Sequence, residues 1–290
     1  MTYCDELVIQ QFATIYFLYF SSNQQLKVTD LSTNPDYDSW LESNKSLRMD
    51  ANNPLFNEGR RRFHLSRYEF AKKFALNKVV LDAACGTGYG SALMADVALQ
   101  VSGMDISQPA VAWAKKVYGN DRTTFHAGCV EFTPFEQNTF DLVTSFETLE
   151  HTLSPLTALW EFVRVMKSDG MGIFSVPNGW GLTPNHFVDF NQELLEQVLA
   201  KCFDHVELYY NNSGGRMSRK AGIGPLETLD EGKAECIIAK CSGPKKSNLP
   251  RDLRDFWTQE IYESVFKRHQ EYVALRKSIP RLLRRFFIKS

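Results

Sequence analysis

The fold is decided by residues 79–90, which read VVLDAACGTGYG. The first five residues are apolar apart from Asp82, as expected of a buried strand. Three glycines follow at alternate positions from Gly86, and an amphipathic pattern comes after them. Glycine permits a positive φ and close backbone approach, so a ligand can lie against the main chain at a helix N-terminus. This stretch therefore predicts a strand, a ligand-binding loop and a helix.

On both sides of this loop the chain alternates short apolar runs with helical patterns. Such alternation is typical of βαβ units around a parallel sheet. We predict seven strands, at 79–83, 100–105, 124–127, 140–145, 172–176, 205–210 and 235–241. Helices are predicted at 89–98, 108–117, 147–151 with 155–167, and 191–202, and another helical pattern begins near Glu58. The fold class is therefore α/β, a doubly wound, Rossmann-like sheet that is mostly parallel with the last strand antiparallel.

Two flanking segments differ in composition from this predicted domain, which spans 57–243. Residues 1–56 form an N-terminal extension, rich in Ser, Asn, Asp and Pro in its second half and without a sustained period. Its apolar run from Leu7 to Phe20 is short for a membrane span and contains Gln10 and Gln11. We expect an amphipathic helix or a loose extension there, with a membrane anchor as the alternative.

Residues 244–290 are predicted to form a linker and a basic amphipathic helical tail. From Lys267 to Ser290 the tail has eight Lys or Arg residues and one acid, Glu271, interleaved with apolar residues. Basic residues near an anionic membrane each contribute about 1 kcal/mol of attraction. The pattern predicts peripheral membrane association, or else a tail that packs on its own domain or in a dimer interface.

Overall charge and cysteine spacing restrict the class of protein. The net charge of −1 and a pI of about 6.6 argue against attraction of the whole protein to nucleic acid. The six cysteines form no CxxC pair, which favours reduced thiols in the cytosol. Asp5 and Glu6 stand before the first apolar run, where a secretory signal would be basic. We expect a cytoplasmic protein, with the inner face of the membrane as a further location.

Two acids at strand ends separate this loop from a dinucleotide site. Asp82 would repel a pyrophosphate but suits an ammonium group, and the glycines do not follow the G-x-G-x-x-G spacing. Asp105 ends the second predicted strand, where a carboxylate can accept hydrogen bonds from both hydroxyls of a ribose. The ligand that fits is one with an amino acid group at one end and a nucleoside at the other.

The pattern Val80-Leu81-Asp82-x-x-x-Gly86-x-Gly88, with Asp105 and Phe140-Asp141-Leu142-Val143, resembles the class I S-adenosylmethionine-dependent methyltransferases. The resemblance implies that Gly86 and Gly88 line the methionine moiety, that Asp105 binds the ribose and that residues 128–130 contact the adenine. Many members have an acid where Cys129 stands, which puts more weight on the backbone of Val130. The implied cofactor-binding residues are Asp82, Ala84, Gly86, Gly88, Tyr89, Asp105, Ile106, Cys129, Val130 and Phe146.

A second cluster follows the fourth and fifth predicted strands. Glu147, Glu150 and His151 have the i, i+3, i+4 spacing that shares one helix face. His186 follows the fifth strand, and both segments are expected at the carboxyl edge of the sheet. We predict that Glu147, Glu150, His151 and His186 bind a metal ion, and that His151 and His186 are the catalytic residues.

This Glu-x-x-Glu-His pattern with a distal histidine resembles the metal-dependent subset of the superfamily, including small-RNA 2′-O-methyltransferases and ubiquinone-pathway O-methyltransferases. The resemblance implies Mg²⁺ or Mn²⁺, which would clamp neighbouring hydroxyls of the acceptor and lower the pKa of one. In the metal-free alternative, His151 or His186 is the general base.

The acceptor is indicated only by peripheral segments. The segments HLSRYEFA at 64–71, DAACGTGYGSAL at 82–93 and NHFVDF at 185–190 resemble methyltransferases associated with bacterial surface-polysaccharide assembly. The resemblance implies a sugar hydroxyl of a glycan or glycan precursor. The core has little basic clustering outside 60–62, which argues against a nucleic acid partner. The alternatives are an RNA 3′ terminal ribose, a catechol-type small molecule and, from another class, a non-catalytic cofactor-binding scaffold.

Overall fold

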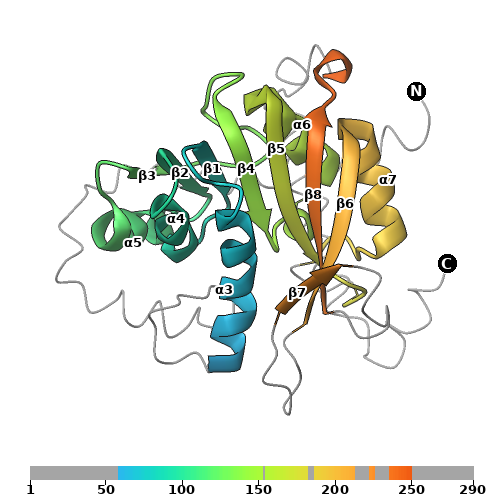
Figure 1. The fold of residues 1–290 in the computed structure, drawn as a ribbon, viewed down its shortest axis with the longest axis horizontal. Coiled ribbons are helices and arrows are strands. Elements are labelled where there is room, and N and C mark those ends of the chain that lie inside the picture. The colour runs from blue at the N-terminus through green and yellow to red at the C-terminus, as the bar shows by residue number, and fades with distance from the viewer. Residues whose placement is uncertain (1–57, 153, 182–185, 213–221, 226–234, 250–290) are drawn as a thin grey trace, which may run out of the picture. The chain divides into compact units, whose positions relative to one another are not determined.

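The structure is a computed structural model that describes residues 58–249 except 153, 182–185, 213–221 and 226–234 (Figure 1). The chain divides into two compact units, and all described residues belong to the unit Lys27–Leu249. The extension 1–56 and the basic helical tail beyond residue 249 lie outside the described residues. Among the helices that are described, none has the length and apolar character needed to cross a membrane.

All seven predicted strands are present, and they lie in one sheet. They are β1 (Val79–Ala83), β2 (Gln100–Asp105), β3 (Thr123–Ala127), β4 (Phe140–Phe146), β5 (Met166–Pro177), β6 (Phe203–Asn212) and β8 (Cys236–Pro244). The order is β3-β2-β1-β4-β5-β8-β6-β7, in which the short strand β7 (Gly222–Pro225) extends the edge beyond the prediction. β3, β2, β1, β4 and β5 pair in parallel, and β8 pairs antiparallel with β5 and β6. The predicted fold class is therefore confirmed.

Five α-helices are described, and three of them begin at a capping side chain. The five helices are α3 (Glu58–Lys72), α4 (Tyr89–Ala95), α5 (Gln108–Tyr118), α6 (Pro155–Val165) and α7 (Gln192–Cys202). The side chains of Ser107, Ser154 and Asn191 accept hydrogen bonds from the first turns of α5, α6 and α7. A side-chain acceptor at this position satisfies a backbone N–H that has no partner within the helix.

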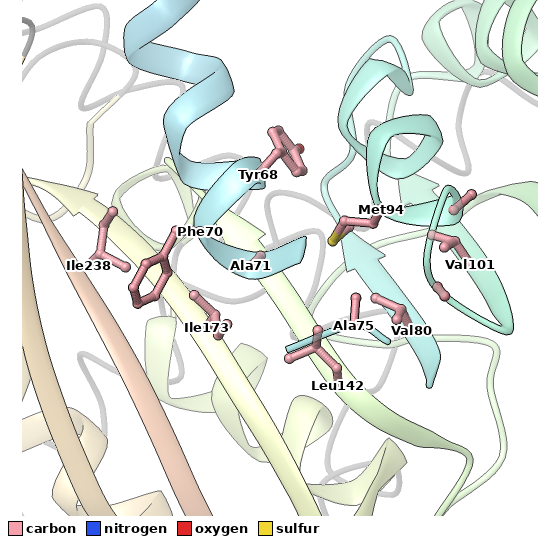
Figure 2. Close-up of a cluster of buried hydrophobic side chains, with 12 residues drawn as sticks. Tyr68, Phe70, Ala71, Ala75, Val80, Met94, Val101, Leu142, Ile173 and Ile238 are labelled. Carbon is pink, nitrogen blue, oxygen red and sulfur yellow. The ribbon is translucent and has the colours of Figure 1, made fainter. Parts of the chain in front are cut away.

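Apolar side chains that alternate along the strands bury both faces of the sheet. On one face, Val80 and Ile173 join a cluster with residues of α3 and α4, shown in Figure 2. On the other face, Phe174 stacks on Phe162 of α6 with ring centroids 5.6 Å apart. Because neighbouring residues of a strand point to opposite faces, this arrangement produces the doubly wound layers.

The predicted helix at 147–151 is wrong. Glu147 directly follows β4 with a φ of 51°, and its N–H donates to the carbonyl of Ser175 of β5, so its backbone is not helical. A short 3₁₀ turn at Leu149–His151 follows, and α6 begins only at Pro155, after the Ser154 cap. The next predicted helix also ends earlier than expected, at Val165, because Met166 already pairs with Phe140 of β4.

Candidate functional site

The carboxyl ends of β1, β2, β4 and β5 lie at one edge of the sheet, since these strands are parallel neighbours. The loop after β1 has left-handed backbone at three alternate positions, Ala84 at φ 61°, Gly86 at 58° and Gly88 at 87°. A non-glycine residue in this conformation is uncommon and concentrates at ligand sites. The edge thus has the loop geometry that the sequence predicts.

The glycines of the loop face different surroundings. A Cβ added at Gly86 would meet no atom within 4 Å, so its α-carbon borders open space. A Cβ at Gly88 would lie 2.7 Å from Ala114 and Phe125, and one at Gly90 would lie 2.0 Å from the ring of Tyr68. Gly86 therefore faces the space available to a ligand, whereas Gly88 and Gly90 allow helices to pack closely around the loop.

Asp105 holds this loop against the end of β2. Its Oδ2 accepts from Gly86 N at 2.9 Å and its Oδ1 accepts from Ser107 N at 2.8 Å. A carboxylate oxygen can accept two hydrogen bonds, so a carboxylate at this position suits the hydroxyls of a ribose. The next residue, Ile106, is 38% exposed, which leaves an apolar side chain beside this carboxylate. The position agrees with the predicted ribose-binding role, which stays a prediction.

Asp82 is enclosed rather than presented to a ligand. It has no exposed surface, and its carboxylate accepts from Ser91 Oγ at 2.6 Å, Thr144 Oγ1 at 3.0 Å and Tyr68 OH at 3.4 Å. Burial raises its pKa to about 7, against the lowering effect of these hydroxyl donors. In this structure Asp82 joins α3, α4 and β4 behind the loop, and a direct contact with an ammonium group would require these partners to move.

The other predicted cofactor residues surround the same edge. Tyr89 and Phe146 both contact Tyr68, with ring centroids 5.3 and 4.9 Å from its ring. Cys129 and Val130 are buried after β3, and the Cys129 thiol donates to Glu131 at 3.4 Å. Nothing in these contacts tests adenine recognition by Cys129 and Val130, which stays a prediction.

Three of the four predicted metal ligands come together at the ends of β4 and β5. One donor atom from each of Glu150, His151 and His186 lies within 4.8 Å of the others. Glu150 Oε1 is 3.7 Å from His151 Nε2, and the two histidine rings have centroids 4.8 Å apart. The backbone carbonyl of Glu150 accepts from Phe187 N at 2.7 Å, which fixes the segment after His186 to the 3₁₀ turn.

The Glu150 side chain is buried without hydrogen bonds. It is 2% exposed, and neither carboxyl oxygen has a hydrogen-bond partner. Burial, and then the nearby Glu147, raise its pKa well above the usual range. Burial also lowers the pKa of His186, with a further contribution from His151. By itself this cluster therefore favours a protonated Glu150 and a neutral His186.

Glu147, the fourth predicted ligand, is directed elsewhere. Its Oε1 is 2.9 Å from Arg67 Nη1, and it accepts from Ser175 Oγ at 2.9 Å and from Cys236 Sγ at 2.9 Å. The positive φ at Glu147 breaks the helical spacing on which the four-ligand prediction depended. The structure therefore supports a cluster of Glu150, His151 and His186, with Glu147 held beside it.

Arg67 is a residue of this site that the sequence reasoning missed. It lies on α3, is fully buried, and donates to His64 Nδ1 at 2.7 Å. Burial and Arg67 lower the pKa of His64 to about 2, so its imidazole is neutral and accepts. The sequence did offer a signal, because Arg67 lies between Phe63 and Ala71 on the apolar face of the helix. A buried arginine requires a charged partner, so this position predicts an acid nearby.

Known proteins that are similar in sequence to this chain include proteins named as methyltransferases. Residues 81–174 match a family described as a methyltransferase domain. A protein of Mycolicibacterium smegmatis named as a probable S-adenosylmethionine-dependent methyltransferase is 32% identical over 44% of this chain and 52% of its own length. A ubiquinone biosynthesis O-methyltransferase of Nitrosospira multiformis is 28% identical over 52% of this chain and 65% of its own length. The chain thus spans less than two thirds of either relative.

A solved structure shows the same fold at low sequence identity. A SAM-dependent methyltransferase from Thermotoga maritima superposes with a TM-score of 0.53 and 15% identity, over 72% of this chain and 95% of that one. This likeness bears on the fold alone.

Proposed function

We propose that this chain is a class I S-adenosylmethionine-dependent methyltransferase, which transfers the methyl group of S-adenosylmethionine to a hydroxyl oxygen bound beside Glu150, His151 and His186. The observation that carries this proposal is the Glu150 carboxyl, buried without hydrogen-bond partners against two histidines. A buried carboxyl without partners is costly to keep. It favours a site completed by a proton, a cation or a substrate hydroxyl.

The donor fits the loop after β1. The open space at Gly86, the N-terminus of α4 and the carboxylate of Asp105 offer contacts for the methionine and ribose moieties. Phe146 ends β4 between this loop and the 3₁₀ turn that bears Glu150 and His151. Donor and acceptor sites are therefore adjacent along one sheet edge, as an in-line transfer requires.

The transfer needs a group that takes the acceptor's proton. The acceptor oxygen forms a bond to the methyl carbon as the bond from that carbon to sulfur breaks, and the hydroxyl proton leaves to a base. His186 suits this role because burial lowers its pKa and keeps the imidazole neutral at physiological pH. We therefore assign proton acceptance to His186 and hydrogen bonding of the acceptor to the more exposed His151.

A divalent ion also fits the cluster, by the chemistry of its donor set. One carboxylate and two imidazoles suit Mn²⁺ or another borderline ion better than Mg²⁺, which prefers oxygen ligands. When bound, the ion would lower the pKa of an acceptor hydroxyl. Glu150, His151 and His186 would hold it, and Arg67 would keep Glu147 beside them without direct ligation.

The acceptor we favour is a ring with two adjacent hydroxyls, which a sugar and a catechol both provide. The relative named for ubiquinone biosynthesis is an O-methyltransferase by name, and this supports oxygen as the methylated atom. The glycan acceptor, the RNA ribose alternative and membrane attachment through the tail remain predictions.

A manganese titration tests the cluster apart from catalysis. Free Mn²⁺ would be followed by electron paramagnetic resonance with the wild type, Glu150→Gln and Glu147→Gln. We expect Glu150→Gln to abolish binding and Glu147→Gln to retain it, provided that thermal melting shows both variants folded. Because Glu147→Gln leaves Arg67 without its carboxylate, the double variant Arg67→Met/Glu147→Gln is the matched control. Loss of binding in that double variant, with melting intact, would restore Glu147 as a ligand.

Methyl transfer from labelled donor to catechol and to methyl glucoside tests the reaction itself. The wild type is expected to methylate at least one of the two, and His186→Asn to lose most of this activity while still binding S-adenosylmethionine. If the protein binds the donor but transfers no methyl group to a hydroxyl, the proposed reaction is wrong and the non-catalytic scaffold is favoured.

A further inference from the structure

Trp180 combines high exposure with a fixed position. The residue is 54% exposed, among the few large apolar residues that the described part of the chain leaves open. Isolated exposed apolar residues are common, so exposure alone indicates nothing about ligands. The surroundings of this indole, however, differ from those of an ordinary surface residue.

Backbone hydrogen bonds hold the chain on both sides of Trp180. Gly179 N donates to the carbonyl of Phe190 at 2.8 Å, and Gly181 N donates to Asp189 Oδ1 at 2.9 Å. Both glycines are left-handed, with φ of 65° and 78°. These bonds join the turn that carries the exposed indole to the segment that leads into α7.

The indole continues a row of rings that begins at the chemical cluster. Its ring is stacked on that of His186, with centroids 6.3 Å apart and planes at 24°. His186 in turn lies against His151. The row has a buried end at Glu150, whose side chain is 2% exposed, and an exposed end at Trp180, which is 54% exposed. Trp180 thus stands between the candidate reaction centre and solvent.

We infer that Trp180 binds the part of the acceptor that lies beyond the reacting ring. This inference rests on the proposed function. One face of the indole is directed toward His186, so a ligand uses its outer face, which lies a full ring farther from the cluster. An indole face binds the apolar face of a sugar ring or an aromatic ring. The acceptor class is therefore a ring with adjacent hydroxyls that carries a second ring, from either a glycan or a phenolic compound.

Two pairs of probes that differ only in length test this inference. The pairs are catechol with 4-phenylcatechol, and methyl glucoside with methyl cellobioside. Binding to the full chain would be measured by calorimetry in the presence of S-adenosylhomocysteine, for the wild type, Trp180→Ala and Trp180→Phe. Leu99→Ala is the matched control, since Leu99 is 62% exposed just before β2, at the opposite edge of the sheet.

One of the two pairs is expected to bind. For that pair, Trp180→Ala should reduce the affinity for the longer probe about tenfold and the affinity for the shorter probe less than about twofold. Trp180→Phe should retain most of the affinity, and Leu99→Ala all of it. An equal effect on both lengths, no effect on either, or no binding of any probe would overturn the inference. The proposed function fails separately, if the wild type does not bind S-adenosylmethionine or transfers its methyl group to no hydroxyl.

Discussion

The donor edge and the acceptor cluster use buried carboxyl groups in opposite ways. Asp82 and Asp105 each accept two or more hydrogen bonds, from hydroxyls in one case and from backbone N–H groups in the other. Glu150 is as deeply buried, yet its carboxyl oxygens have no such bond. The buried carboxyl groups of the donor edge have their hydrogen bonds before any ligand binds, whereas Glu150 would obtain them only from a ligand.

This contrast suggests a division of tasks between the two regions. Preorganised hydrogen bonds fix the shape of the donor loop, so that binding the donor requires little rearrangement. A carboxyl without partners keeps its capacity for a proton, a cation or a substrate. Changes at the donor edge should therefore affect affinity and stability, whereas changes at the acceptor cluster should affect turnover.

The largest effect is expected at Glu150. Glu150→Gln removes the group's capacity to accept a proton or bind a cation, and turnover should fall by about 100-fold or more. Stability should stay the same or rise, because the replaced carboxyl has no hydrogen bonds to lose. Steady-state kinetics and thermal melting measure the two effects, with Glu136→Gln on the surface as the control. A large loss of stability would show that Glu150 has structural partners instead.

The next effect concerns the pH dependence of stability at Asp82. A folded-state pKa of about 7, above the ordinary value of 3.8, means that the folded state binds more protons than the unfolded state between these two pH values. Its contribution to stability therefore falls as the pH rises toward 7. Relative to Asp82→Asn, the wild type should lose about 3 kcal/mol of unfolding free energy between pH 5 and pH 8. Urea denaturation at pH 5 and pH 8 measures the unfolding free energy of both proteins. If the difference between them is the same at both pH values, Asp82 remains ionised throughout.

Two glycine substitutions should distinguish a glycine that borders the donor site from a glycine that is packed against its neighbours. Gly86→Ala places a methyl group in open space at the donor edge, and we expect about tenfold weaker donor binding with about 1 kcal/mol of lost stability from the positive φ. Gly88→Ala places it against Ala114 and Phe125, and about 2 kcal/mol of stability should be lost. Calorimetry measures the donor affinity of both variants, and thermal melting measures their stability. Equal donor affinity in Gly86→Ala and the wild type would place the donor elsewhere.

Local sequence patterns predicted most of the fold. The expected strands at 79–83 and 100–105 coincide with β1 and β2, because apolar residues alternate with strong turn signals there. β7 escaped prediction, since Gly222–Pro225 has no apolar alternation and depends on pairing with β6. Local pattern determines central strands, whereas an edge strand depends on its neighbour.

The site was predicted less completely than the fold. Strand ends placed Asp105, Glu150 and His186 at the right edge, because parallel topology determines where loops meet. Helical spacing misplaced Glu147, whose conformation depends on Ser175 and Arg67, residues far away in the sequence. Contacts of this kind are set by tertiary packing and leave no periodic signal.

The central claim is tested most directly by calorimetric titration with S-adenosylmethionine of the wild type, Asp105→Ala and Glu150→Gln. The account predicts saturable binding by the wild type, at least about tenfold weaker binding by Asp105→Ala, and unchanged binding by Glu150→Gln. Absence of binding by the wild type, or equal binding by Asp105→Ala, would contradict it.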